Sequence, residues 1–255
     1  MRYQYPMFRQ IGVCMLRKVI AAGILLATAQ VARADYQCSV KPQDDITVTA
    51  QQVAVSGSNG NLTITPQGEM TFNGKAVTPD QTLRQQAIAY QAAVRRDLPW
   101  IDQGARQRLE TSRVALDKII VEKLGSGSHV RTRLTTLDTQ LKAQMNRIIE
   151  HRSDGLMFHH AAIDQVRAEG DKLVQSTMGG ILQDSLNELG SSSGNGGNGS
   201  NPLQALMGNL GGLQQAVRSE VNKQEADFQQ FGHEVCQKAG SLEKQRTAIY
   251  QQLDQ

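Results

Sequence analysis

The sequence predicts a mainly helical α+β protein, in which a small N-terminal antiparallel β-meander precedes an elongated bundle of about four or five helices. Two patterns predict this fold. Between Ile46 and Val77, apolar residues alternate with polar ones, which is the period of a half-buried strand. From Thr78 onward they recur every three or four residues, which is the period of an amphipathic helix. Such spacings bury one face of each helix against its neighbours.

Residues 1–34 have the layout of a secretory signal peptide. Arg17 and Lys18 precede an uncharged, mainly apolar run of eleven residues, 19–29, which as a helix spans about half of the bilayer core. Small residues then flank Arg33, so cleavage is expected between Ala34 and Asp35. Counted from Met1 the segment is longer than the usual range of about 15–30 residues. Translation is therefore predicted to start at Met15.

The chain that remains after cleavage has 22 basic and 24 acidic residues and contains no basic block. This balance does not predict nucleic-acid binding. No later stretch is long and apolar enough to cross a bilayer.

The predicted meander occupies residues 35–78, and its strands are separated by residues that favour turns. Its faces are short and poor in aromatic residues, so it needs support from helices. The alternating apolar positions are Ile46, Val48, Val53, Val55, Leu62, Ile64, Met70 and Phe72. The turn signals are Ser58-Asn59-Gly60, Pro66-Gln67-Gly68 and Asn73-Gly74.

A helical bundle is predicted over residues 79–189, beginning at Thr78-Pro79-Asp80-Gln81, with Thr78 as the cap and Pro79 as the first helical residue. Pro99 predicts a break or a kink after Leu98, with a second helix from about Ile101 to Leu124. A third helix is capped by Ser128, and a fourth is predicted from Leu156 to Leu189, after an interruption at Ser153-Asp154-Gly155. The third has a near-heptad stripe of Val130, Leu134, Leu137, Leu141, Met145 and Ile148.

Residues 190–201 contain only Gly, Ser and Asn and predict a flexible linker. A long last helix over 202–255 is predicted to pack back on the bundle, with Phe228, Phe231 and Val235 on its buried face. Two motif matches fall in the linker: G-x-G-x-x-G at 194–199 and G-x-S-x-G at 190–194. Neither has the strand that its chemistry requires. No catalytic residue and no cofactor are therefore predicted.

The histidines do not predict a metal site. His159 and His160, as neighbours on a helix, would point about 100° apart. His160 shares a helical face with Asp164, and His233 with Cys236, but no third ligand is indicated. The remaining histidines are His129 and His151.

Residues 173–217 contain only two charged side chains, Asp184 and Glu188, although 131–172 contain 13. Glycine pairs at Gly179-Gly180 and Gly211-Gly212 disfavour helix by about 1 kcal/mol per glycine. The favoured interpretation is close packing of the two helices on each other. The alternative is a surface that binds an unknown envelope protein or a membrane.

Several runs resemble the YggN family of exported enterobacterial proteins of unknown function. They include ADYQCSV, NGNLTITPQG, LPWIDQGA, MNRIIEHRSDGLMFHHAAIDQVRAEG, MGGILQDSLNE and DFQQFGHEVC. The resemblance covers essentially all of the mature chain and implies a periplasmic location. It implies no activity, ligand or catalytic residue.

Cys38 and Cys236 are the only cysteines that remain after cleavage. In an oxidising compartment such a pair predicts a disulfide rather than two free thiols or a metal site. An intermolecular bond is the alternative, but closure within one chain has the higher effective concentration if the two segments meet.

The sequence therefore favours a non-enzymatic periplasmic interaction or structural protein that acts through helical surfaces. Two alternatives are a holdase for unfolded envelope proteins and a metal-binding protein or enzyme built on His151, His159 or His160.

Overall fold

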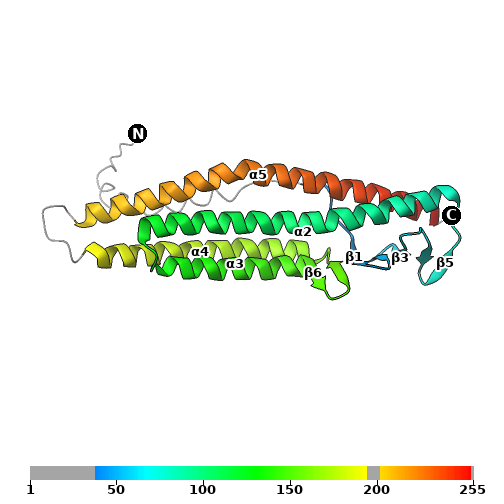
Figure 1. Ribbon diagram of the computed structural model, residues 1–255, viewed down its shortest axis with the longest axis horizontal. Helices are drawn as coiled ribbons and strands as arrows, with labels where there is room; N and C mark the ends of the chain where they lie inside the picture. Colours follow the sequence, from blue (N-terminus) through cyan, green and yellow to red (C-terminus); the bar gives the residue numbers. More distant parts are fainter. Residues whose placement is uncertain (1–37, 194–201, 254–255) are drawn as a thin grey trace, which may run out of the picture. The chain divides into compact units, whose positions relative to one another are not determined.

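The computed structural model describes the backbone of residues 38–193 and 202–253, and side chains except those of 189–210 within these ranges. The predicted start at Met15, the cleavage site between Ala34 and Asp35, and residues 194–201 of the predicted linker lie outside the described residues. Seven strands and four helices are described, in the order β1–β5, α2, α3, β6, β7, α4, α5 (Figure 1). The fold is thus mainly α with one sheet, as predicted.

All seven strands form one antiparallel sheet, in the order β5-β4-β3-β2-β1-β7-β6. Strands β1 to β5 confirm the predicted meander. They span Asp44–Thr49, Val53–Gly57, Gly60–Ile64, Met70–Phe72 and Lys75–Val77. Asn73 and Gly74 form the β4–β5 turn with φ of 50° and 79°, the left-handed conformation that Asn-Gly pairs favour.

The sheet is completed by a hairpin that the sequence did not predict, β6 (Ile149–Arg152) and β7 (Gly155–Phe158). β7 pairs with β1, placing Gly155 opposite Thr49. Gly155 has φ 153°, and a Cβ atom built there would lie 1.8 Å from the carbonyl oxygen of Val48. Gly155, which was predicted to interrupt a helix, therefore allows β1 and β7 to approach each other. The fourth helix consequently begins at Ala162 and not at Leu156.

α2 spans Gln81–Leu124, and its first turn is capped by Asp80, whose side chain accepts a hydrogen bond from the backbone N–H of Leu83 at 2.7 Å. Pro99 lies inside this helix. The predicted break at Pro99 and the separate helix from Ile101 are therefore wrong.

Contacts on both sides of Pro99 hold α2 against α5 (Pro202–Leu253). Lys238 donates to the buried carboxylate of Asp97 at 2.9 Å. The ring centroids of Trp100 and Phe231 lie 5.3 Å apart. Tertiary contacts of this kind offset the helical hydrogen bond that a proline removes.

The other two helices are α3 (His129–Ile148) and α4 (Ala162–Ser193). Ser128 caps α3 as predicted, accepting from the backbone N–H of Val130 at 3.1 Å. α2 contacts both α5 and α3, α3 contacts α4, and α4 contacts α5. The helix α4 continues to Ser193, four residues into the predicted linker.

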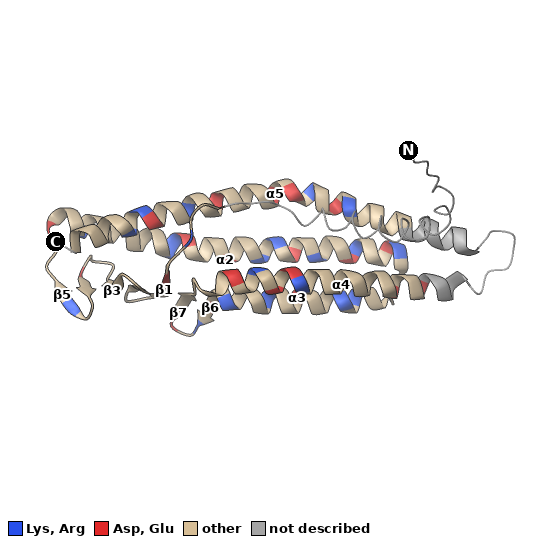
Figure 2. Ribbon diagram, turned by 180° about the vertical axis from the view of Figure 1, so that it is seen from behind, with Lys and Arg blue, Asp and Glu red and all other residues tan. Residues whose placement is uncertain are grey.

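The apolar core is concentrated where the sheet meets α2 and α5. Val53, Val55, Leu62 and Ile64 from the sheet are fully buried with Val94 and Ile249 from the helices. A second, smaller cluster contains Ile120, Val130 and Leu134. Figure 2 shows positively and negatively charged residues interspersed along α2, α3 and α5. In the described part of the chain, no helix is long and apolar enough to cross a membrane.

Candidate functional site

Two links hold the N-terminal segment against α5. Cys38 and Cys236 form the predicted disulfide, with Cα atoms 5.6 Å apart. Farther along both segments, Asp44 at the start of β1 forms an ion pair with Arg246. Burial lowers the pKa of the Arg246 guanidinium, although not enough to deprotonate an arginine. The segment between the links follows α5, because a Cβ at Gly240 would lie 3.4 Å from the side chain of Val40.

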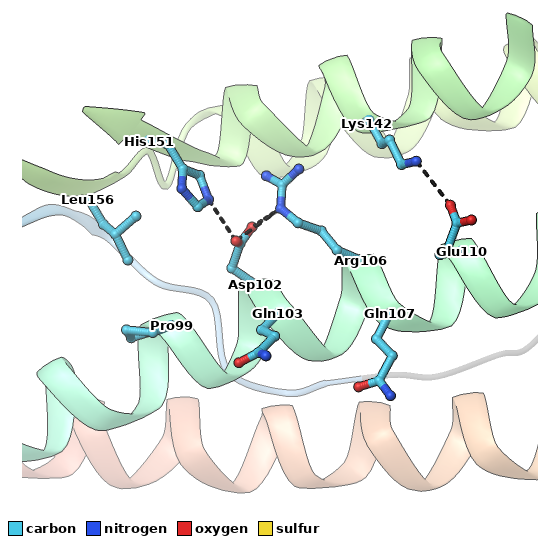
Figure 3. Close-up of a pocket in the computed structure, with 9 residues that line it drawn as sticks. All are labelled: Pro99, Asp102, Gln103, Arg106, Gln107, Glu110, Lys142, His151 and Leu156. Carbon is cyan, nitrogen blue, oxygen red and sulfur yellow. Dashed lines mark hydrogen bonds and ion pairs between the residues drawn. The ribbon is translucent and has the colours of Figure 1, made fainter. Parts of the chain in front are cut away.

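An open groove of about 730 Å³ follows one side of α2 (Figure 3). α2 contributes six of the residues that line it, and α3, β6 and β7 contribute one each. The lining residues are Pro99, Asp102, Gln103, Arg106, Gln107, Glu110, Lys142, His151 and Leu156. Five of them are ionisable, so this groove brings several functional groups together on a concave surface.

Asp102 organises one end of the groove. Its buried carboxylate accepts hydrogen bonds from Arg106 Nε at 2.9 Å and lies 2.7 Å from His151 Nε2. Arg106 also donates from Nη2 to Asn146 of α3 at 2.6 Å. The carboxylate therefore fixes the orientation of the guanidinium and the imidazole, and joins β6 to α2.

Glu110 and Lys142 occupy the other end, with their Oε2 and Nζ atoms 3.2 Å apart. Lys142 also binds Asp138 at 2.7 Å, and Arg113 binds Glu110 at 2.5 Å. Hydrogen bonds from Arg113 and then Lys142 lower the pKa of Glu110 to about 2. Bonds to Asp138 and Glu110 raise the pKa of Lys142. Glu110 and Lys142 are therefore both charged at neutral pH.

The groove offers groups for binding and one pair with the chemistry of a general base. His151 and Asp102 form a pair that could orient a general base. The nine lining residues, however, include no Ser, Thr or Cys that this base could activate. The groove is also bridged by ion pairs that connect α2 to α3 and β6, so its charged groups contribute to structure as well.

His159 and His160 do not lie on a helix as predicted. They precede α4. Both face Asp45 of β1, at 3.8 Å from His159 Nδ1 and 2.7 Å from His160 Nδ1. His159 Nε2 also lies 3.0 Å from Glu150.

The proposed pairings of histidine with a second ligand are not formed. Asp164 lies 4.0 Å from Lys41, while His160 bonds to Asp45 instead. Cys236 is committed to the disulfide and is not available to His233 as a metal ligand. No group of three or more His, Cys, Asp or Glu residues that could hold a metal ion occurs within the described residues.

The glycine pairs of the charge-poor region do not make the close contacts that were expected. A Cβ at Gly179, Gly211 or Gly212 would meet no described atom within 4 Å. Only Gly180 has a neighbour, the guanidinium of Arg133 at 2.5 Å. α4 and α5 do contact each other, but within the described residues no close contact is made through Gly179, Gly211 or Gly212.

One aromatic position in α5 also departs from the prediction. Phe231 is buried, but Phe228 remains 42% exposed. A Cβ at Gly104 would lie 2.5 Å from the Phe231 ring, so this glycine makes room for Phe231 between α2 and α5.

Among the ionisable residues of the groove, only His151 is a candidate functional residue from the sequence alone. Asp102, Arg106 and Glu110 recur every four residues and share a face of α2, which is a detectable signal. The predicted break at Pro99 divided the helix just before them. The partners on α3 and β6 could be found only from the tertiary structure.

The fold and the groove define a class of protein: a disulfide-linked α+β protein in which a seven-stranded sheet supports long helices with a charged groove. Residues 38–255 match the family described as "Protein of unknown function (DUF2884)", and the chain belongs to this family. Similar relatives are the proteins named "Uncharacterized protein YggN" from Escherichia coli strain K12 and from E. coli O157:H7. Each is 56% identical over 240 residues, covering 92% of this chain and 98% of the relative. No solved structure matches the chain.

Proposed function

We propose that this is an exported, non-enzymatic protein that binds a component of the cell envelope through its helical surfaces. The single observation that carries the proposal is a stripe on α4 formed by Met178, Leu182 and Leu186. These residues are four apart, so they follow one side of the helix. None is buried, and Leu186 is 44% exposed.

The charges near the α4 stripe are already used within the chain. Asp184 forms an ion pair with Arg133, which lowers the pKa of this carboxyl. Glu188 accepts a hydrogen bond from the backbone N–H of His129 at 2.5 Å. A helix face with apolar side chains and internally paired charges favours an apolar partner over a charged one.

Location in the periplasm is supported by two independent features. The N-terminal 34 residues have the layout of a signal peptide. Disulfides such as Cys38–Cys236 persist in exported proteins and are rare in reducing compartments.

Site-specific photo-crosslinking in living cells tests the proposal. A benzophenone amino acid is placed at Met178, Leu182 or Leu186, and at Gln183 as the control. Gln183 is exposed and its side chain points about 100° away from that of Leu182. We expect one discrete protein adduct from the stripe positions and none from Gln183. Equal labelling at all four positions, or no adduct at any, would contradict the proposal. Flotation of the purified protein with liposomes would instead assign the stripe to a membrane surface.

A histidine-based enzyme or metal-binding protein is the second candidate, and the contact between His151 and Asp102 is the observation that favours it. This candidate is tested by measuring the zinc bound per protein after the protein has been washed with a chelator and reloaded with zinc. Stoichiometric zinc that is lost in His151→Ala would support it over the interaction protein.

A further inference from the structure

We propose that the groove along α2 binds an extended segment of an unfolded polypeptide, about five residues long. This inference deepens the proposed function, on which it rests, by naming a site and a chemical class of partner. It corresponds to a holdase among the interaction proteins considered above.

The groove does not select its ligand by net charge. Among its lining residues, Arg106 and Lys142 are balanced by Asp102 and Glu110. A phosphate or a polyanion would meet a carboxylate beside each cation. A polypeptide main chain is uncharged but has a donor and an acceptor in each residue, and it can therefore use both kinds of group.

The dimensions of the groove agree with an extended chain. Its lining on α2 runs from Pro99 to Glu110, with one or two residues from each helical turn between them. These eleven steps correspond to about 16 Å at a rise of about 1.5 Å per residue. An extended chain of about five residues covers the same length at about 3.3 Å per residue.

The groove offers groups of different kinds (Figure 3). His151 and Lys142 reach from β6 and α3 toward Asp102 and Glu110 of α2, while Gln103 and Gln107 extend from α2 in the other direction. A glutamine amide both donates and accepts, which suits a main chain whose sequence is not fixed.

The end of the groove at Pro99 and Leu156 is apolar. It can accept one apolar side chain of the bound segment, and such side chains are exposed in unfolded proteins. The groove therefore favours unfolded segments over the polar surface of a folded protein.

The experiment measures binding of fluorescein-labelled, reduced and carboxymethylated α-lactalbumin, a permanently unfolded probe, by fluorescence anisotropy. Gln103→Trp and Gln107→Trp each fill the groove without removing a charged partner, because both residues are exposed. Gln85→Trp, at an exposed position of α2 outside the groove, is the matched control. Circular dichroism verifies that all three variants fold.

We expect both groove variants to bind the probe at least about tenfold more weakly, as for loss of a central contact, and Gln85→Trp to bind like the unsubstituted protein. Binding should change by less than about twofold between about 50 and 500 mM NaCl, because the groove is charge-balanced. The proposal is overturned if the unsubstituted protein does not bind the probe, if both groove variants bind normally, or if salt abolishes binding.

A further variant separates this inference from the proposed function. Met178→Ser combined with Leu182→Ser alters the α4 stripe and leaves the groove intact. If the stripe crosslinks a partner but the groove variants bind the probe normally, only the groove inference fails. If the groove variants lose the probe but the stripe captures no partner, only the assignment of the stripe fails.

Discussion

The buried ion pair between Asp44 and Arg246 should be a principal determinant of stability. The side chain of Asp44 is 3% exposed and that of Arg246 is 8% exposed, so neither charge is screened by water. Neither carboxylate oxygen of Asp44 has a hydrogen-bond partner among the described groups, which leaves Arg246 as its compensation. Asp44 also begins β1, whereas Arg246 belongs to the last helix.

Asp44→Ala should lower the free energy of unfolding by about 3 kcal/mol, because it removes one of the two carboxylates that pair with the buried guanidinium and leaves only Glu243. In a chain of this size, each 1 kcal/mol corresponds to a shift in Tm of about 2–4 °C. The double variant Asp44→Ala with Arg246→Met removes both charges and should recover part of this loss, because an apolar replacement of a buried pair is often neutral. The recovery is incomplete because Glu243 then loses the guanidinium with which it pairs.

Urea unfolding followed by circular dichroism, on protein with the disulfide intact, measures the three free energies needed for this comparison. Asp44→Asn provides an additional control that keeps the side-chain shape and removes only the charge. The reasoning is refuted if Asp44→Ala costs less than about 1 kcal/mol, as a surface pair would. It is also refuted if the double variant is less stable than Asp44→Ala.

Two further predictions concern the sheet and the groove. Gly155→Ala should destabilise the protein by more than about 2 kcal/mol in urea unfolding, because a side chain there is strained and meets the Val48 carbonyl. Gly127→Ala is the control, because a Cβ at that position meets no described atom within 4 Å. Equal effects of the two substitutions would refute the argument. The pKa of Glu110 is lowered from 4.5 to about 2 in the folded protein. The stability that Glu110 contributes is therefore fully present above about pH 5 and is lost as the pH falls toward about 2. Glu110→Gln should flatten the dependence of the unfolding free energy on pH in this window. An unchanged slope of unfolding free energy against pH would exclude a contribution of Glu110 to stability.

Local patterns were sufficient to predict the meander, the cap at Ser128 and the last helix, whereas α2 is capped by Asp80 and not by Thr78. Each depends on residues that are close in sequence, such as the Asn73-Gly74 turn or the N-cap hydrogen bond. The disulfide could be predicted across 198 residues because its two cysteines had no competing partner. A disulfide can thus be predicted without knowledge of the fold when only two cysteines are available to form it.

The errors occurred where contacts between distant residues decide the conformation. Pro99 disfavours a helix locally, but Asp97 and Trp100 beside it bind α5. Gly155 resembles a helix interruption, and only the position of β1 shows that it permits strand pairing. Both errors affected the candidate site, because the groove lies between the continuous α2 and the unexpected hairpin.

The groove depends on the connection between sheet and helices. The β6–β7 hairpin brings His151 to α2 because β7 pairs with β1. β1 is linked in turn to α5 through Asp44, and the segment before it through Cys38. The β6–β7 hairpin on one side of the groove is therefore held by β1. The ion pair of Asp44 and the disulfide of Cys38 attach this same strand and the segment before it to α5. If the groove binds polypeptide, reduction of the disulfide should weaken binding through this strand even though neither cysteine lines the groove.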